Sequence, residues 1–237
     1  MKLNTFKNYQ DYAHAQETMN KVKLDYVWVD EHELESICTL FQKQKKTIKN
    51  GICHGVRNGW EVIFFREKLK ADVFGTEISE TAKNYPHMIQ WDFHKIKPEW
   101  IHNFDFIYSN SLDHSYNPQL CLEQWMRCLD RKGLCFIHWA PDHGADVMDK
   151  ADCFGANEKE YQELLTKKYV LVDKLVTKTK KRCSAIFVIG HSPESYQMDR
   201  TTTSQDDWTN EEYTLWHRFW FSRWVQRGLK LFGLNND

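Results

Sequence analysis

The sequence of 237 residues lacks several features that would assign a protein quickly to a class. It has no excess of charge of one sign, because 32 lysines and arginines nearly balance 33 aspartates and glutamates. The positive field with which proteins neutralise duplex phosphates is therefore missing, and we expect no nucleic-acid partner. The sequence also contains no apolar run of signal-peptide or membrane-span length, so we expect residence in the cytoplasm.

The seven cysteines include no C-x-x-C pair, which argues against a zinc cluster, and their odd number argues against a disulfide framework. Cys135 lies among apolar neighbours, and we interpret most of the cysteines as buried thiols. His138, Asp142 and His143 offer potential metal ligands close together in the sequence. Their spacing matches no known zinc type, so we expect no metal there.

The composition indicates a folded domain with a full core. Hydrophobic residues make up 41% of the chain and aromatic residues 14%, which excludes a mainly disordered protein. A chain of this length accommodates one α/β domain with an appendage.

Short apolar runs alternate with helical patterns along most of the chain, which predicts a largely parallel sheet covered on both faces. Asp30 and Glu33 form a capping-box pattern for a helix that precedes the first strand. Asn117 and Pro118 predict the start of a later helix. The predicted strands are 47–54, 72–78, 88–93, 104–109, 134–139, 169–176 and 184–189, and the predicted helices among them are 59–69, a short one after Ser79, 119–129 and 158–168.

The last two predicted strands, 170–176 and 184–189, are joined by only the seven polar residues 177–183. Parallel neighbours need a crossover of a dozen or more residues, so these strands must be antiparallel if they are adjacent. A standard nicotinamide-binding domain does not end in this way, which disfavours a nicotinamide oxidoreductase.

A glycine-containing segment, 51–59, follows the first predicted strand. Gly55 and Gly59 would let the backbone turn sharply and approach a bulky ligand. Glu77 lies roughly 20 residues later, where a carboxylate can accept hydrogen bonds from ribose hydroxyls. Glycine pairs also mark ordinary strand-to-helix turns, so the segment alone is ambiguous.

Together, these elements resemble the class I S-adenosylmethionine-dependent methyltransferase family. The resemblance implies a three-layer, Rossmann-like α/β fold with a mostly parallel seven-stranded sheet whose last strand is antiparallel. The resemblance covers roughly residues 47–191. Its main support is the segment 53–59, in the place of the family's acid-x-Gly-x-Gly-x-Gly loop, and Glu77, which ends the second strand. Further support comes from residues 90–93 after the third strand, 104–110 as the fourth strand and 128–133 before the fifth.

The resemblance also implies a cofactor, S-adenosylmethionine, and residues that bind it. Gly55 and Gly59 would line its amino-acid part, Glu77 would bind the ribose hydroxyls and Asp92 the adenine amino group. Trp91 is either a stacking partner of the adenine or a core aromatic. The full set of expected cofactor-binding residues is Cys53, Gly55, Arg57, Gly59, Glu77, Trp91, Asp92 and Asn110.

Two residues depart from the family pattern. Cys53 replaces the usual acid, which weakens the grip on the cofactor's ammonium group, and Arg57 replaces the middle glycine, which crowds the loop. A decayed site on a methyltransferase-like scaffold is the alternative.

The loop 109–116 leaves the fourth strand at the edge of the sheet where ligands bind. His114 is the first candidate for a catalytic base, since its ordinary pKa near ~6.5 suits proton removal at neutral pH. Asp113 would orient His114 or steer the acceptor. His138 and His143 are weaker candidates on the same rim, and a simply solvated loop histidine is the alternative.

The tail differs from the rest of the chain, because Tyr213, Trp216, Trp220 and Trp224 form an aromatic stripe at helical spacing. Docking onto the domain, dimerisation and contact with a membrane surface all remain open for this helix. We therefore divide the chain into an N-terminal helical region (1–46), a methyltransferase-like domain (47–191), a linker (192–208) and a C-terminal amphipathic helix (209–237).

The sequence thus predicts an O-methyltransferase that acts on a small molecule or a saccharide-type hydroxyl. The acceptor class follows from the balanced charge, the candidate histidine and the lack of an Asn-Pro-Pro-Tyr-like motif after the fourth strand. The alternative is a catalytically silent binding module that acts through the aromatic tail.

Overall fold

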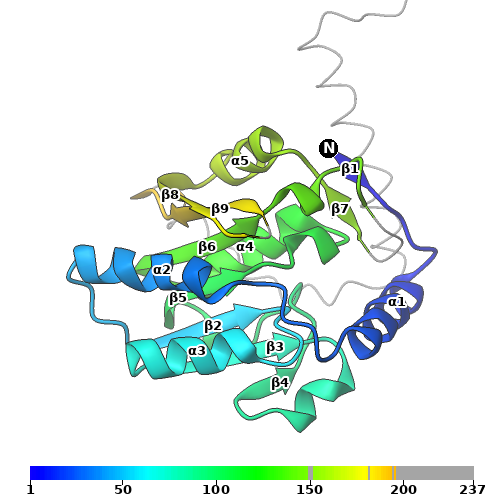
Figure 1. Ribbon diagram of the computed structural model, residues 1–237, viewed down its shortest axis with the longest axis horizontal. Coiled ribbons are helices and arrows are strands. Elements are labelled where there is room, and N and C mark those ends of the chain that lie inside the picture. Colours follow the sequence, from blue (N-terminus) through cyan, green and yellow to red (C-terminus); the bar gives the residue numbers. More distant parts are fainter. Residues whose placement is uncertain (149–151, 181, 194, 196–237) are drawn as a thin grey trace, which may run out of the picture.

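The computed structural model describes residues 1–148, 152–180, 182–193 and 195. These residues form three layers, with helices on both faces of a central sheet (Figure 1). The predicted helix 209–237 and most of the predicted linker lie outside the described residues. No helix among the described residues combines the length and the apolar character needed to span a bilayer.

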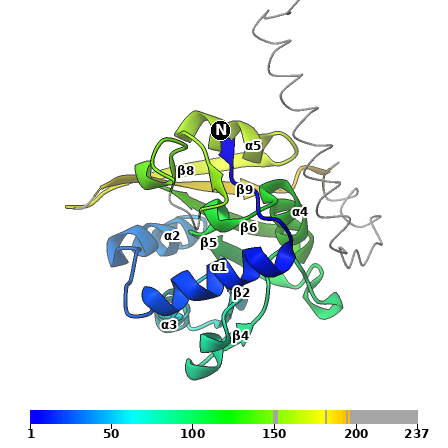
Figure 2. The same cartoon turned by 90° about the vertical axis from the view of Figure 1, so that its right-hand side faces the viewer.

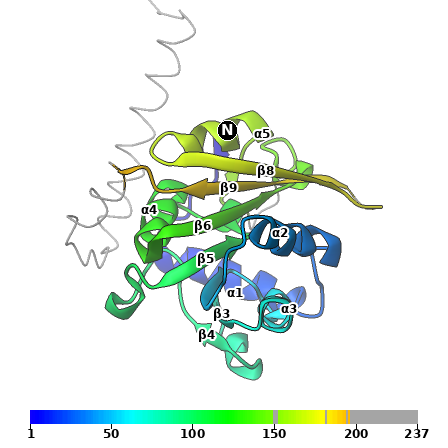
Figure 3. The same ribbon diagram turned by 90° about the vertical axis from the view of Figure 1, so that its left-hand side faces the viewer.

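The central sheet has seven strands in the order β4-β3-β2-β5-β6-β9-β8. All neighbours are parallel except that β9 pairs antiparallel with both β6 and β8, which confirms the predicted terminal hairpin. Figure 3 shows this hairpin as two long strands at the edge of the sheet. The strands are β2 (Asn50–His54), β3 (Asp72–Glu77), β4 (Met88–Gln90), β5 (Phe104–Ser109), β6 (Leu129–Trp139), β8 (Val170–Lys178) and β9 (Cys183–Gly190).

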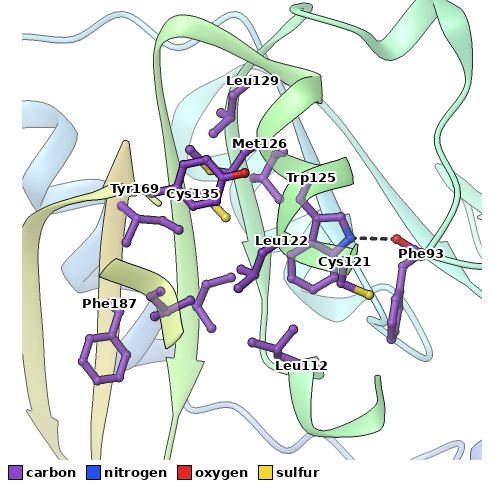
Figure 4. Close-up of a cluster of buried hydrophobic side chains, with 14 of the residues drawn as sticks. Phe93, Leu112, Cys121, Leu122, Trp125, Met126, Leu129, Cys135, Tyr169 and Phe187 are labelled. Carbon is purple, nitrogen blue, oxygen red and sulfur yellow. Dashed lines mark hydrogen bonds between the residues drawn. The ribbon is translucent and has the colours of Figure 1, made fainter. Parts of the chain in front are cut away.

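Each face of the sheet buries one apolar cluster. Helices α2 (Glu31–Lys43) and α3 (Trp60–Leu69) cover the face that carries Cys53 and Phe106. Helices α4 (Pro118–Cys128) and α5 (Glu158–Thr166) cover the opposite face. Figure 4 shows that second cluster, in which the Trp125 indole donates a hydrogen bond to the Phe93 carbonyl oxygen at 2.8 Å.

The helix starts follow local capping chemistry. Asp30 accepts a hydrogen bond from the His32 N–H and forms the predicted capping box with Glu33 at the start of α2. The Asn117 side chain accepts from the Leu120 N–H at the start of α4. Ser79 caps the short helix after β3, which is a 3-10 helix over Glu80–Asn84.

The structure corrects several predicted boundaries. Strand β6 begins at Leu129, five positions before the predicted start at 134, because the exposed residues 130–132 still continue the strand. Strand β4 ends at Gln90 rather than at 93. Two short strands that were not predicted, β1 (Lys2–Leu3) and β7 (Phe154–Gly155), pair antiparallel.

The N-terminal helix α1 (Tyr9–Val22) lies at the end of the sheet toward which β2 points (Figures 1 and 2). Its Tyr12 packs on Tyr116 with ring centroids 4.7 Å apart, and Tyr116 belongs to the loop after β5. Helix α1 therefore covers part of the edge at which the loops after the parallel strands gather.

Candidate ligand-binding and active site

The loop after β2 has the backbone conformation that its glycines allow. Gly55 and Gly59 have φ angles of +69° and +73°, in the left-handed region that favours glycine. A side-chain Cβ on Gly55 would lie 2.7 Å from the Ser111 Cβ, so the loop also requires glycine for close packing. Arg57 is left-handed as well, with φ of 39°. This loop leads directly into α3, whose N-cap is Gly59.

A cavity of about 400 Å³ opens beside this loop. Loops that follow the carboxyl ends of β2, β5 and β6 line it, as expected for an open α/β sheet. It is lined by Gly55, Val56, Arg57, Asn58 and Glu61, by Asn110, Ser111, Asp113 and His114, by Lys23, Tyr26, Val27 and Trp28, and by Asp142, His143, Val147 and Asp152.

A smaller cavity of about 60 Å³ shares Gly55, Arg57 and His114 with the larger one. Glu77 and residues of α1 complete its lining. The buried Glu77 carboxylate accepts hydrogen bonds from the Arg57 N–H at 3.1 Å and the Ser79 N–H at 3.2 Å. Burial raises the pKa of Glu77, and these two hydrogen bonds oppose the rise. The glycine loop and Glu77, which were predicted together, are therefore brought together.

Arg57 and Cys53, the two departures from the expected loop, point to different surroundings. The Arg57 guanidinium donates to the Tyr26 carbonyl oxygen at 2.8 Å, so its side chain reaches toward the segment between α1 and α2 while it lines both cavities. The Cys53 side chain is fully buried in the apolar cluster under α2 and α3 and lines neither cavity.

Glu61 is a cavity residue that the sequence motifs did not indicate. It comes from the first turn of α3 and is only 5% exposed. Its Oε1 accepts a hydrogen bond from the Asn110 side-chain amide at 3.1 Å, and Asn110 lines the cavity beside it. Burial raises the pKa of Glu61 to about 7. An acid in the first turn of a helix is common, so its position in the sequence alone gave no distinct signal.

Asp92 and Trp91 line neither cavity. Asp92 is buried and accepts hydrogen bonds from the Tyr9 hydroxyl and the His94 ring, both at 2.7 Å. Burial acts to raise the pKa of Asp92, but the His94 charge and these hydrogen bonds outweigh it and lower the pKa. Trp91 packs against Trp100 with ring centroids 5.6 Å apart. Their contact with a cofactor stays a prediction.

Asp113 and His114 lie in a 3-10 helix over Leu112–His114, in the loop that follows β5, and both line the larger cavity. The His114 Nε2 is 3.8 Å from Asp113 Oδ2, and its Nδ1 is 3.8 Å from Asp152 Oδ1. His143 approaches from the loop after β6, with Nε2 4.0 Å from Asp113 Oδ2, and its ring stacks on Trp28. Asp113 thus lies between two imidazoles on the cavity wall.

The same wall contains a set of potential metal ligands. Asp113, His114 and Asp152 place ligand atoms within 4.8 Å of one another, which could hold a divalent cation. His138, another candidate from the sequence, is fully buried away from both cavities. Its Nδ1 lies 3.0 Å from the Tyr108 hydroxyl and its Nε2 3.5 Å from the buried Glu33 carboxylate, so His138 belongs to the core.

Comparison by sequence gives no relative: no protein-family model and no curated protein matches the chain. Comparison by structure gives many similar folds. One of them is the 1,6-didemethyltoxoflavin-N1-methyltransferase of Burkholderia thailandensis with bound 1,6-didemethyltoxoflavin and S-adenosylhomocysteine. The two structures superpose with a TM-score of 0.63 at 14% sequence identity, and the matched region covers 80% of this chain and 92% of the Burkholderia chain.

The magnesium protoporphyrin IX methyltransferase of Synechocystis PCC 6803, with bound S-adenosylhomocysteine, has a TM-score of 0.57 and 13% identity and covers 76% of this chain and 99% of its own. The CurJ carbon methyltransferase has a TM-score of 0.53 and 13% identity and covers 74% of this chain and 58% of its own. The chain therefore has the fold of the class I methyltransferases, as predicted from its sequence.

Proposed function

We propose that the protein is an S-adenosylmethionine-dependent methyltransferase that acts on a small molecule. The observation that carries this proposal is the larger cavity, which joins the strained glycine loop to the loop after β5 at the carboxyl edge of a class I methyltransferase fold. Fold alone does not define an activity, but a cavity of this size at this edge is a common place for a cofactor and its substrate.

The cofactor would lie along the glycine loop. Gly55 would let the backbone approach the ligand closely, and the buried Glu77, whose two oxygens accept hydrogen bonds from the Arg57 and Ser79 N–H groups, would also accept from the two ribose hydroxyls. Arg57 lines both cavities and supplies a positive charge for the carboxylate of the amino-acid end. Binding of the adenine amino group by Asp92 would require this buried carboxylate, which lines neither cavity and accepts a hydrogen bond from Tyr9 of α1 at 2.7 Å, to become accessible to the ligand.

The acceptor would occupy the part of the cavity that Asp113, His114 and His143 line. The bound cofactor supplies a sulfonium methyl group that is open to in-line attack, so the protein chiefly orients the two reactants. For a hydroxyl acceptor we propose His114 as the base that accepts the proton, with the Asp113 carboxylate 3.8 Å away stabilising the resulting imidazolium. The solved neighbours methylate different kinds of atom, and the hydroxyl acceptor is our own choice from the histidine on the wall.

Cytoplasmic residence belongs to the same proposal. None of the seven cysteines forms a disulfide, and six of them are buried. Free thiols are typical of proteins in a reducing compartment.

Calorimetric titration of the full chain tests the proposal. S-adenosylmethionine and S-adenosylhomocysteine should bind, and nicotinamide dinucleotides should not. A Glu77→Ala variant should lose about 1 to 3 kcal/mol of binding free energy for the adenosyl ligands if the carboxylate holds the ribose. The exposed Glu80→Ala variant is the matched control and should bind as the unchanged protein does. If neither adenosyl ligand binds, the enzyme proposal is wrong. Binding without methyl transfer to any acceptor would favour the catalytically silent binding module.

A further inference from the structure

The acid that the family pattern places after the first strand of the domain is missing in this chain, where Cys53 takes its position. The structure shows that this side chain turns into the apolar cluster with Val62 and Phe65 and is fully buried there. Cys53 therefore contributes nothing to the cavity, and the amino-acid end of a cofactor has no carboxylate partner at that position.

Glu61 brings a carboxylate to the cavity from the other end of the same loop. Glu61 lies two positions beyond Gly59, in the first turn of α3, and lines the larger cavity together with Gly55 and Val56. The Asn110 amide fixes it by donating to Oε1 at 3.1 Å. A carboxylate offers about four acceptor positions, and the Asn110 amide and the backbone N–H of Glu61 occupy two of them, so Glu61 keeps the capacity to accept from a ligand.

The charges near Glu61 match the two ends of an amino acid. Arg57 lies on the loop that precedes α3 and lines the same cavity, and its guanidinium, which donates to the Tyr26 carbonyl oxygen at 2.8 Å, has further N–H donors and the charge opposite to that of a carboxylate. Glu61 is 95% buried, since only 5% of its surface is exposed, and a buried carboxylate gains most from a cationic partner that shares its poorly hydrated site.

We propose that Glu61 binds the ammonium group of the ligand's amino-acid end and so takes over from the acid that Cys53 replaces. The loss of the acid at Cys53 and the gain of Arg57 are then related. Glu61 would bind the ammonium group in place of the missing acid, and Arg57 would bind the carboxylate. This inference rests on the proposed function, because it assumes a ligand with an amino-acid end.

Two related ligands test the proposal on the full chain by calorimetry. S-adenosylhomocysteine carries the amino-acid end, whereas 5′-methylthioadenosine has the same nucleoside and thioether but lacks that end. A Glu61→Gln substitution keeps the shape of the side chain and removes the charge. We expect it to weaken binding of S-adenosylhomocysteine by at least about tenfold, the usual effect of losing a hydrogen bond to a charged group, and to change binding of 5′-methylthioadenosine less than about twofold.

Glu67→Gln is the matched control, because Glu67 is an exposed acid on the same helix. It should bind both ligands as the unchanged protein does, and thermal unfolding of both variants verifies that they are folded. Equal weakening of both ligands by Glu61→Gln, or no weakening of either, would overturn the role of Glu61. If the unchanged protein binds neither ligand, the proposed function fails and this inference fails with it. If the unchanged protein binds both and Glu61→Gln has no effect, only the inference fails.

Discussion

Glu61 gives the sharpest prediction about stability, because burial raises its pKa from 4.5 to about 7. In the unfolded chain Glu61 ionises near pH 4.5, while in the folded protein it keeps its proton until about pH 7. The folded state therefore binds more protons in this interval, and stability falls as the pH rises. The stabilising contribution of protonated Glu61 is fully present below pH 4.5 and is lost by about pH 7.

At about 1.4 kcal/mol per pKa unit, the rise corresponds to roughly 3 kcal/mol of stability. Besides burial, the backbone N–H of Glu61, the Asn110 amide and the Arg57 guanidinium lower the pKa of Glu61, whereas the Glu77 carboxylate raises it. The buried Cys53 thiol and Tyr108 hydroxyl also face it, and their own pKa values are raised. Burial also raises the pKa of Glu77, and because the unchanged protein and the Glu61→Gln variant both contain Glu77, the difference between them isolates Glu61.

Urea unfolding of the unchanged protein and of Glu61→Gln at pH 5, 6, 7 and 8 measures this difference. The variant should be more stable by less than about 1 kcal/mol at pH 5, and by roughly 3 kcal/mol at pH 7 and above. The larger difference corresponds to a rise in melting temperature of roughly 6 to 12 °C for a domain of this size. The reasoning would be refuted if the difference in free energy of unfolding between the two proteins stayed constant from pH 5 to 8, or if the variant were less stable at pH 8. Glu67→Gln should show no such divergence.

Four further outcomes are expected. Gly55→Ala should lower the free energy of unfolding by about 1 to 3 kcal/mol, because φ is +69° and a Cβ would lie 2.7 Å from the Ser111 Cβ; a melting temperature equal to that of the unchanged protein would contradict this. His114→Ala should reduce kcat roughly 100-fold or more with a hydroxyl acceptor while S-adenosylhomocysteine still binds, and an unchanged kcat would remove His114 as the base. Methyl transfer should survive treatment with EDTA, because we interpret Asp113 and His114 as a carboxylate and base; loss of activity that Mn²⁺ restores would instead assign Asp113, His114 and Asp152 to a metal. Liposomes should retain more of the full chain than of a chain lacking residues 209–237 if the aromatic tail contacts membranes, and equal cosedimentation would end that hypothesis.

The sequence predicts well those elements whose signals are local. The capping box at Asp30 and Glu33, the Asn117 cap and the short connection between β8 and β9 each depend on neighbouring residues, and all three occur in the structure. The early start of β6 was missed because residues 130–132 are polar and exposed, so they show no strand pattern. The pairing of β1 with β7 joins residues about 150 positions apart in two-residue strands, which no local pattern indicates.

The residues of the candidate site also fall into those that the sequence predicts and those that only tertiary packing brings to the cavity. Gly55, Glu77 and the loop with His114 follow strand ends, and the parallel order of the strands is enough to bring them to one edge. Trp28 and Asp152 reach the cavity only through tertiary packing of segments that have no motif of their own. Asp92 follows a strand end as expected, but the Tyr9 hydroxyl from α1 occupies its carboxylate, and a helix so distant in the sequence could not be placed beforehand.

The arrangement around Glu61 bears on whether the site has decayed. In the folded protein this carboxylate lies in a cavity wall with one side-chain hydrogen bond, and its burial costs roughly 3 kcal/mol above pH 7 without a ligand. A glutamine there would keep the shape and remove that cost. Groups that destabilise the fold while facing a cavity are characteristic of functional sites, where a ligand offsets the cost. If Glu61 binds the ammonium group as proposed, Cys53 is a core residue of a rearranged site and not the remnant of a lost one, because the acid that it replaces has a counterpart on the wall of the same cavity.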